Sequence, residues 1–368
     1  MRKTLVALPV LVACGAALAQ SSVTIYGVLD IHVGKVKGGK WGVSNGEGYV
    51  LPAASNVATA AKDGFNSTTV LGFRGSEDLG GGLRANFNLQ TGGFDLSTGS
   101  TALAFSRESW VGLESSSLGA VQFGRSASLA AKVMGPYDLN GNSYSSAFAN
   151  SGLSSVLWYG TSRRSDQIQY ATPNMSGVVV RAAYTAKGDA SPNGVELPAT
   201  ARGSLSGGAT YQVGKLSVSA FGESKKSSAP GARAAYAAGV MYDFSVVKVS
   251  ATFNRRELGG HGQNVGWNSF KANGFAGGGG KGFTLGAQAP ISVANIGFQI
   301  ARNTDTKVNA YEVYGNYALS KRTRLYVDFG KTTGVNASAS IAPTATLSGS
   351  NAVPRNPYVL AAGIVHTF

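Results

Sequence analysis

The run LGFRGSEDLGGGLRANFNLQTGGF, residues 71–94, decides the fold because it has the pattern of two β-strands joined by a tight turn. Apolar side chains recur at every second position on both sides of residues 76–82, which is the period of a strand with one apolar and one polar face. The turn is rich in glycine and acidic residues, which end a strand. The apolar face carries Leu71, Phe73, Leu83, Ala85, Phe87 and Leu89, and the opposite face carries Gly72, Arg74, Arg84, Asn86, Asn88 and Gln90.

The same alternation continues along the rest of the chain. In residues 311–319 and 324–329, charged side chains lie on the face opposite the apolar stripe. Residues 105–113 alternate less cleanly, because Trp110 and Val111 are adjacent. Short turns and longer polar connections follow one another, which predicts about 16 strands, an even number that closes a sheet and removes its edges. The predicted fold is an all-β, transmembrane antiparallel β-barrel.

The composition agrees with a barrel whose strands face lipid on alternate residues. Hydrophobic residues make up 43% of the chain, charged residues make up only 14%, and there are 51 glycines. No apolar run after Val12 reaches the roughly 18 residues of a membrane-spanning helix. A large soluble β-sandwich or an adhesin is the alternative for such a composition.

Residues 1–19 have the features of a secretory signal peptide. Arg2 and Lys3 precede an apolar run at 5–12, and residues 17–19 form a small-residue cleavage site. The mature domain is therefore expected to cover residues 20–368.

Cys14 is the only cysteine, and it leaves the chain with this signal. Without it no disulfide stabilises the mature protein, so stability must come from the backbone ladder and packing. In the alternative interpretation, residues 11–14 are the site at which a bacterial lipoprotein is cut and acylated.

Residues 125–159 form a long stretch without sustained periodicity between two strand-like segments. Residues 134–141 break any strand, and the small polar run at 143–146 supplies no helix-period core face. A compact domain rarely carries so long an insertion unless the insertion is functional. The hypothesis is that this segment folds into the lumen of the barrel and narrows it.

Several motifs resemble those of the Gram-negative general porin family, especially the betaproteobacterial trimeric porins. They are SVTIYG at 22–27, the run at 71–94, SRESWVGLESSSLGAVQFGR at 106–125, QIQYATPNMSG at 167–177, YALSKRTRLYV at 317–327 and GIVHTF at 363–368. The resemblance implies a homotrimeric outer-membrane barrel of about 16 strands whose third extracellular loop bends inward. It also implies that the terminal Phe368 is the signal read by the barrel assembly machinery, although a final Phe also suits an aromatic girdle.

The same resemblance implies a constriction lined by arginines that face the inserted loop. Arg107 in the FSRESW stretch and Arg163 shortly before IQYATPN match two positions of that lining. A third position, just ahead of LGFRG, holds Val70 here, so the basic cluster is thinner than in strongly anion-selective relatives. Glu108 beside Arg107 dilutes it further if it reaches the lumen. Compensation is expected from other arginines, namely Arg74, Arg84, Arg164, Arg181 and Arg324.

These residue types suit a water-filled pore with a controlled electric field. Guanidinium groups stay charged and present planar donors to carboxylate and phosphate. Inside a narrow, low-dielectric wall they raise the local concentration of anions. Asp138 on the inserted segment either adds negative charge opposite the arginines or only caps a turn. The expected function is passive diffusion of small hydrophilic solutes with a mild preference for anions, and outer-membrane lipid and lipopolysaccharide are expected partners of the surface.

Other classes of function find little support in the sequence. His32, His261 and His366 lie on separate segments without a second ligand at metal spacing, so neither a metal nor another cofactor is expected. The GGGGK run at 277–281 lacks the Ser or Thr and the helix of a phosphate loop. Scattered basic residues argue against nucleic-acid binding, and no catalytic residues are expected. Two alternatives stay open: a substrate-specific porin for organic anions, and a plugged structural or adhesive barrel.

Overall fold

The structure of the protein is a computed structural model, which describes residues 22–37, 58–97, 100–141, 143–150, 163–186, 203–225, 232–258, 280–305, 307–334 and 358–368. The predicted signal peptide, Cys14, His261 and most of the GGGGK run lie outside the described residues, as do residues 142 and 151–159 of the predicted inserted segment.

The described part of the chain contains seventeen strands in one sheet, two short α-helices and one 3-10 turn. The helical elements are α1 (Leu129–Met134), η1 (Gly135–Tyr137) and α2 (Ala147–Asn150). The strands are β1 (Ser22–Lys37), β2 (Ala58–Asp63), β3 (Val70–Gly80), β4 (Leu83–Asp95), β5 (Ser100–Ser115), β6 (Gly119–Ala127), β7 (Arg163–Ala171), β8 (Val178–Thr185), β9 (Ser204–Val213), β10 (Leu216–Lys225), β11 (Ala232–Asp243), β12 (Lys248–Leu258), β13 (Gly280–Ile291), β14 (Ala294–Asn303), β15 (Asn309–Ala318), β16 (Thr323–Thr333) and β17 (Tyr358–Thr367).

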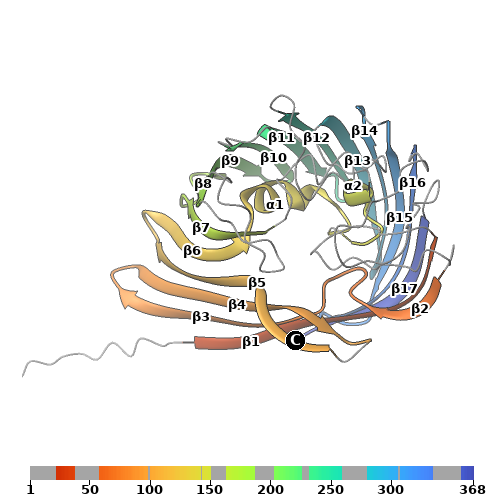
Figure 1. Ribbon diagram of the computed structural model, residues 1–368, viewed down its shortest axis with the longest axis horizontal. Helices are drawn as coiled ribbons and strands as arrows, with labels where there is room; N and C mark the ends of the chain where they lie inside the picture. Colours follow the sequence, from red (N-terminus) through yellow and green to blue (C-terminus); the bar gives the residue numbers. More distant parts are fainter. Residues whose placement is uncertain are drawn as a thin grey trace, which may run out of the picture.

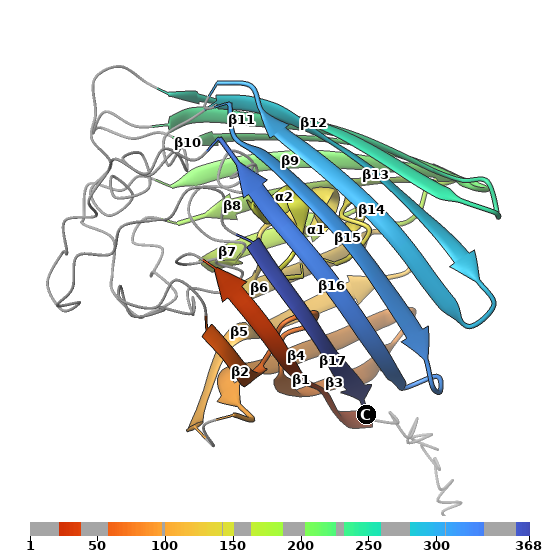
Figure 2. The same cartoon turned by 90° about the vertical axis from the view of Figure 1, so that its right-hand side faces the viewer.

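The sheet closes into a ring because β1 pairs with β17, the last strand (Figure 1). β2 and β3 share one position in this ring, since residues 31–36 of β1 pair with β2 and residues 22–28 pair with β3. The seventeen strands therefore fill sixteen positions, and the predicted closed antiparallel barrel is confirmed. Neighbouring strands run obliquely side by side, as β14 to β17 do in Figure 2.

The two faces of each strand differ in exposure as the sequence pattern predicts. On β15 and β16, Val313 and Val327 are 48% and 53% exposed, whereas Glu312 and Asp328 are 0% exposed. The exposed apolar face meets lipid in a membrane and the polar face turns into the barrel. None of the described helices is long and apolar enough to cross a membrane.

Residues 128–150, here called the inner segment, lie inside the ring of strands (Figure 1). α1 packs against β8 to β11, η1 against β11 and β12, and α2 against β14 to β16. Within this stretch, which has no sustained periodicity in the sequence, α1 is a short helix that the sequence did not indicate. Ser128 caps the helix, with its Oγ accepting from the backbone N of Ala131 at 3.2 Å, and one face is buried. The predicted inserted segment begins at Arg125. In the structure β6 continues to Ala127, so the connection after β6 begins at Ser128.

Small residues of the wall make room for the inner segment. The α1 face packs on Ala183, Ala235 and Ala237 of the barrel. Four wall glycines lie so close to the segment that a Cβ on any of them would come within 3.1 Å of one of its atoms: Gly208 against Val133, Gly239 against Tyr137, Gly286 against Leu139 and Gly330 against Ser145. Because these wall residues are small, the inner segment can approach the backbone of the wall along this line.

A buried carboxylate on β15, Glu312, holds the middle of the inner segment. It accepts five hydrogen bonds, from Asn140 Nδ2 (2.7 Å), Ser143 Oγ (3.0 Å), Ser145 Oγ (2.9 Å), the Ala147 backbone N (3.1 Å) and Gln299 Nε2 (2.7 Å). A carboxylate is acceptor-only, so it satisfies several donors that the segment cannot pair within itself. The segment is therefore attached to the wall at one charged point.

Residues 64–69, between β2 and β3, form a second inward contact with the inner segment. The Phe65 ring stacks between Tyr144 and Tyr326, with ring centroids 5.8 and 6.1 Å away. Asn66 Nδ2 donates to Asn140 Oδ1 at 3.2 Å and to Asp328 Oδ2 at 2.9 Å. Residues 64–69, where the chain leaves the barrel wall between β2 and β3, therefore form a second attachment for the inner segment.

Gly330→Ala is expected to destabilise the folded barrel by about 1–3 kcal/mol, because overpacking a close contact shifts the backbone. The new Cβ would lie 2.6 Å from the backbone carbonyl oxygen of Ser145. Urea unfolding of the purified protein measures the change. Gly315→Ala on β15 is the control, since its Cβ would have no heavy atom nearer than 3.9 Å. Equal midpoints for the two variants would contradict the close-approach explanation.

Glu312→Gln is expected to lower the free energy of unfolding by about 1–3 kcal/mol, because the new amide turns a donor toward groups that are themselves donors. Protease cleavage within the inner segment is expected to accelerate in the same variant. Glu77→Gln on the exposed end of β3 serves as the matched control. Wild-type stability and cleavage in Glu312→Gln would show that the carboxylate does not hold the segment.

Candidate pore constriction

Glu108 on β5 is the centre of a charged group on the inner wall. Together with Arg107, Lys132 and Arg163 it is here called the Glu108 group. Its Oε1 accepts from the backbone N of Ala127 at 3.1 Å, and its Oε2 accepts from Trp110 Nε1 at 2.9 Å. Arg163, the first residue of β7, brings its Nε to 4.0 Å from Glu108 Oε1. The sequence did not decide whether Glu108 reaches the lumen. The structure places its carboxylate among these groups on the inner wall.

Arg107 reaches the same region because β5 carries an irregularity there. Gln90 pairs with Glu108 and Gly92 pairs with Ala104, so three residues of β5 lie opposite Thr91 alone. This bulge interrupts the strict alternation of faces. It explains why the sequence of β5 alternates less cleanly than that of its neighbours.

Hydrogen bonds connect Arg107 to Tyr26 on β1. Arg107 Nε donates to Gln90 Oε1 at 3.0 Å, and Gln90 Nε2 donates to Tyr26 OH at 3.2 Å. The Arg74 guanidinium carbon lies 5.1 Å from the centroid of the Tyr26 ring, which is a cation–π distance. Arg74 and Arg107 are thus linked through one tyrosine, on the inner face of β1 and β3 to β5.

Lys132 on α1 is a basic residue of this region that the sequence analysis missed. Its Nζ donates to Gln122 Oε1 at 3.0 Å and to Gln169 Oε1 at 2.5 Å. Burial lowers the pKa of Lys132 to about 8, against the attraction of Glu108 and with a contribution from repulsion by Arg181. The signal that would have found it is Ser128, a helix N-cap residue four positions before Lys132.

The other predicted arginines are distributed more widely. Arg164 forms an ion pair with Glu223, Nη2 to Oε1 at 3.1 Å, and both side chains are buried. Arg324 donates from Nη2 to Asn66 Oδ1 at 2.7 Å. Arg84 is exposed beside the short turn that joins β3 to β4, away from the Glu108 group. Val70, at the position that is basic in the related pattern, is a buried apolar residue with 4% exposure.

Asp138 is buried in the attachment of the inner segment. Its Oδ1 accepts from the backbone N of Asn140 at 3.2 Å and from Gln299 Nε2 at 2.8 Å, and its Oδ2 accepts from Ser146 Oγ. The first of these contacts is the turn cap that the sequence analysis named as one of two alternatives. Asp138 is only 5% exposed, so its negative charge would act on solutes in the lumen from a buried position.

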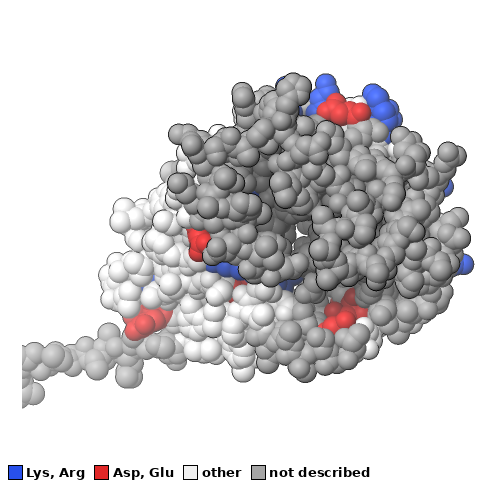
Figure 3. Space-filling view, viewed as in Figure 1, with Lys and Arg blue, Asp and Glu red and all other residues white. Residues whose placement is uncertain are grey.

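The basic residues around Glu108 and the largest group of buried carboxylates lie on different parts of the barrel. The basic residues lie on β5 to β8 and α1, while Glu312 and Asp328 lie on β15 and β16, on the other side of the ring, and Asp30 lies on β1 (Figure 1). Charged side chains of both signs are visible around the central hollow in the space-filling view (Figure 3).

The described residues contain no group of three or more His, Cys, Asp or Glu that could hold a metal ion. His32 is buried, with its ring 4.8 Å from that of Phe65, and His366 lies beside Thr323, with Nδ1 to Oγ1 at 2.9 Å. The two histidines therefore lie in structural contacts.

Comparison with known proteins adds independent evidence on the family. The family model of Gram-negative porins matches residues 4–337. An outer membrane porin protein of Bordetella pertussis is 30% identical over 375 residues, covering 89% of this chain and 93% of that protein. Outer membrane porin protein 32 of Delftia acidovorans is 31% identical over 343 residues, covering 89% of this chain and 88% of that protein.

Solved structures agree at the level of the fold. The anion-selective porin from Comamonas acidovorans superposes with a TM-score of 0.68 at 23% identity, covering 95% of this chain and 100% of that one. OmpF of Salmonella typhi gives a TM-score of 0.64 at 15% identity, covering 94% and 97%. The family match extends over most of the chain and the closed sixteen-position barrel agrees with it. The chain therefore belongs to the Gram-negative porins and is a channel-forming β-barrel of the outer membrane.

Proposed function

We propose that this porin lets small hydrophilic solutes diffuse through a water-filled lumen with a mild preference for anions. The observation that carries the proposal is the Glu108 group, in which Arg107, Lys132 and Arg163 bring three positive charges to the surroundings of one carboxylate. The carboxylates of Asp30, Glu312 and Asp328 are buried and hydrogen-bonded, so they present little exposed negative charge to the lumen. The anion selectivity stated for the Comamonas acidovorans porin agrees with this assignment.

We assign the constriction to the space between the inner segment and the wall formed by β5 to β8. Support comes from the position of α1 inside the ring and from Lys132, which extends from α1 to glutamines on β6 and β7. The predicted constriction loop, 125–159, contains the inner segment. A narrow passage with fixed charges on its wall selects by charge without any tight binding step.

We also propose that the protein is a homotrimer and that it acts as a channel without catalysis. A solved neighbour, OmpT of Vibrio cholerae, has a trimer form. Phe368 is proposed as the signal for the barrel assembly machinery, because its backbone exchanges two hydrogen bonds with Gly27, each of 3.1 Å, and so completes the ring. Lipopolysaccharide is the proposed partner of the basic outer loops.

The double variant Arg107→Ala with Arg163→Ala is expected to lower the anion-over-cation permeability ratio by roughly twofold or more, because two fixed charges leave the wall. The reversal potential in a planar bilayer under a salt gradient measures this ratio. Arg302→Ala, at an exposed position of β14, is the matched control and is expected to keep the wild-type ratio. An unchanged ratio in the double variant would contradict the arginine assignment, and absence of conductance from folded wild-type protein would contradict the channel.

Raising the pH from 7 to 9 is expected to reduce the anion preference, because Lys132 loses its proton as the pH passes the pKa of about 8. The unfolded chain holds that proton to about pH 10.4. The folded barrel therefore gains stability between these two values while the charge of the lumen falls. Reversal potentials measured at each pH test this. Lys132→Arg, whose guanidinium stays charged, is expected to show no change near pH 8, and an equal pH response in this variant would exclude Lys132 as the titrating group.

A further inference from the structure

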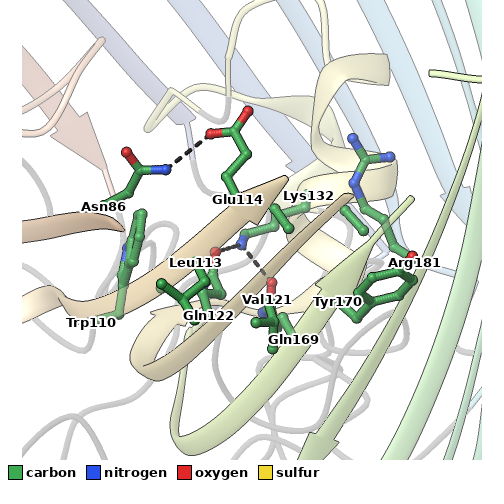
Figure 4. A pocket seen from close by; sticks show the side chains of 13 residues that line it. Asn86, Trp110, Leu113, Glu114, Val121, Gln122, Lys132, Gln169, Tyr170 and Arg181 are labelled. Carbon is green, nitrogen blue, oxygen red and sulfur yellow. Dashed lines mark hydrogen bonds between the residues drawn. The ribbon is translucent and has the colours of Figure 1, made fainter. Parts of the chain in front are cut away.

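A hollow of about 150 Å³ lies between α1 and the inner wall of β4 to β8 (Figure 4). Its lining contains the charged side chains of Glu114, Lys132 and Arg181 together with the indole of Trp110. Arg107 and Arg163 do not line it, so the hollow adjoins the Glu108 group and shares with it Lys132 and Trp110, the hydrogen-bond partner of Glu108. We call it the Lys132 hollow.

The floor of the hollow is built from one row of directly paired residues. Glu114 on β5 pairs with Ala120 on β6, Ala120 pairs with Ala171 on β7, and Ala171 pairs with Arg181 on β8. Two alanines thus lie between two long side chains of opposite charge. Strands in a sheet are about 4.8 Å apart, so the ends of this row are about 14 Å apart.

A second row borders the first, and its side chains are polar apart from one glycine. Asn86, Gly112, Gln122 and Gln169 are paired in turn across β4 to β7. Gly112 adds no side chain, so the hollow extends over both rows at this point. The small residues at the centre explain why a cavity exists here, since a larger side chain at 112, 120 or 171 would fill it.

The end of the hollow near β8 carries two cations with unused donors. Lys132 Nζ has three protons and uses two of them on Gln122 and Gln169. Arg181 donates to no side chain among the residues that the structure describes. The two groups are close enough for Arg181 to repel the charge of Lys132. An anionic group between them would relieve that repulsion and accept hydrogen bonds from both.

The opposite end of the hollow carries a hydrogen-bond acceptor. Glu114 Oε2 accepts from Asn86 Nδ2 at 2.9 Å and keeps its second oxygen available in an exposed position. A carboxylate there repels the anionic end of a solute and attracts a hydroxyl or amino group. The two ends therefore orient an occupant in one direction.

We propose that the Lys132 hollow is a docking site for a single-ring aromatic carboxylate on its way through the channel. The carboxylate lies between Lys132 and Arg181, the ring lies over Ala120 and Ala171, and a para donor reaches Glu114. A cavity of about 150 Å³ is the size that holds one benzene ring. This inference rests on the proposed function, because the solute must enter through the lumen.

The site is expected to bind weakly, as a channel requires. A solute must leave as readily as it enters, so tight binding would block the pore. Charge-assisted contacts to two cations and one ring contact on an open wall are expected to give an affinity in the millimolar range. The gain is a higher local concentration of the preferred solute beside the constriction.

Binding of 4-hydroxybenzoate to the purified folded protein in detergent tests the proposal, measured by saturation-transfer NMR with acetate and phenol as competitors. Acetate has the charge without the ring, and phenol has the ring without the charge. The expected result is millimolar binding of 4-hydroxybenzoate that either competitor displaces only at about tenfold higher concentration or more. Equal potency of acetate or phenol would overturn the assigned class of solute.

Two variants locate the site. Ala120→Leu fills the floor without changing any charge, and Arg181→Gln removes one cation without changing the floor. Each is expected to weaken 4-hydroxybenzoate binding by about tenfold. Ala182→Leu, on the exposed outer face of β8, is the matched control and is expected to bind as wild type does. Wild-type affinity in both test variants would overturn the proposal, and if Ala120→Leu does not fold, Arg181→Gln decides alone.

Conductance of the same preparations separates this inference from the proposed function. Wild-type conductance without any 4-hydroxybenzoate binding would overturn the docking site and leave the diffusion channel intact. Binding without conductance would overturn the channel and leave the hollow as a ligand site. Both signals together, with binding lost in the two variants, are the expected result.

Discussion

Backbone hydrogen bonding in a lipid environment is the constraint on which the rest of this structure depends. Hydrocarbon offers no water to an unpaired N–H or C=O, so every strand must have a neighbour on both sides. The chain meets this requirement by pairing β1 with β17, down to the mutual hydrogen bonds of Gly27 and Phe368. Closure then divides every strand into a face toward lipid and a face toward the lumen, which is the origin of the alternating sequence pattern.

The inner segment lies inside the barrel, away from lipid, and is held by polar contacts with the wall. It runs along the inner wall as short helical turns. Glu312 accepts hydrogen bonds from it, Asn66 bridges it to Asp328, and small residues of β8 to β16 let it approach. The attachment lies on the side of β14 to β16, and the basic residues lie on the side of β5 to β8. One side of the barrel therefore holds the inner segment in place, and the other side carries the basic residues.

The sequence predicted the barrel well because the period of two is imposed locally by each strand. Leu325, Val327 and Phe329 face outward and Asp328 faces inward as the alternation indicates. The sharing of one barrel position by β2 and β3 was not predicted, since residues 58–69 give no sign that a strand leaves the wall and returns.

The site was less predictable, because it depends on contacts between distant segments. Arg107 and Arg163 were identified from resemblance alone, and the bulge that brings Arg107 inward depends on its pairing with β4. Lys132 was missed because a helix of six residues leaves a weak periodic signal. Asp138 was assigned two possible roles, and only the packed structure shows the wall residues that bury it.

The central claim is that mobile anions in the lumen meet the basic wall of β5 to β8 while the carboxylates across the barrel are sealed in packing. A crystal structure of the protein soaked in bromide, with anomalous scattering used to locate the ions, tests this most directly. The account predicts bromide beside Arg107, Arg163 or Lys132 and the inner segment attached at Glu312. Bromide distributed evenly around the lumen, or an inner segment detached from β15, would contradict it.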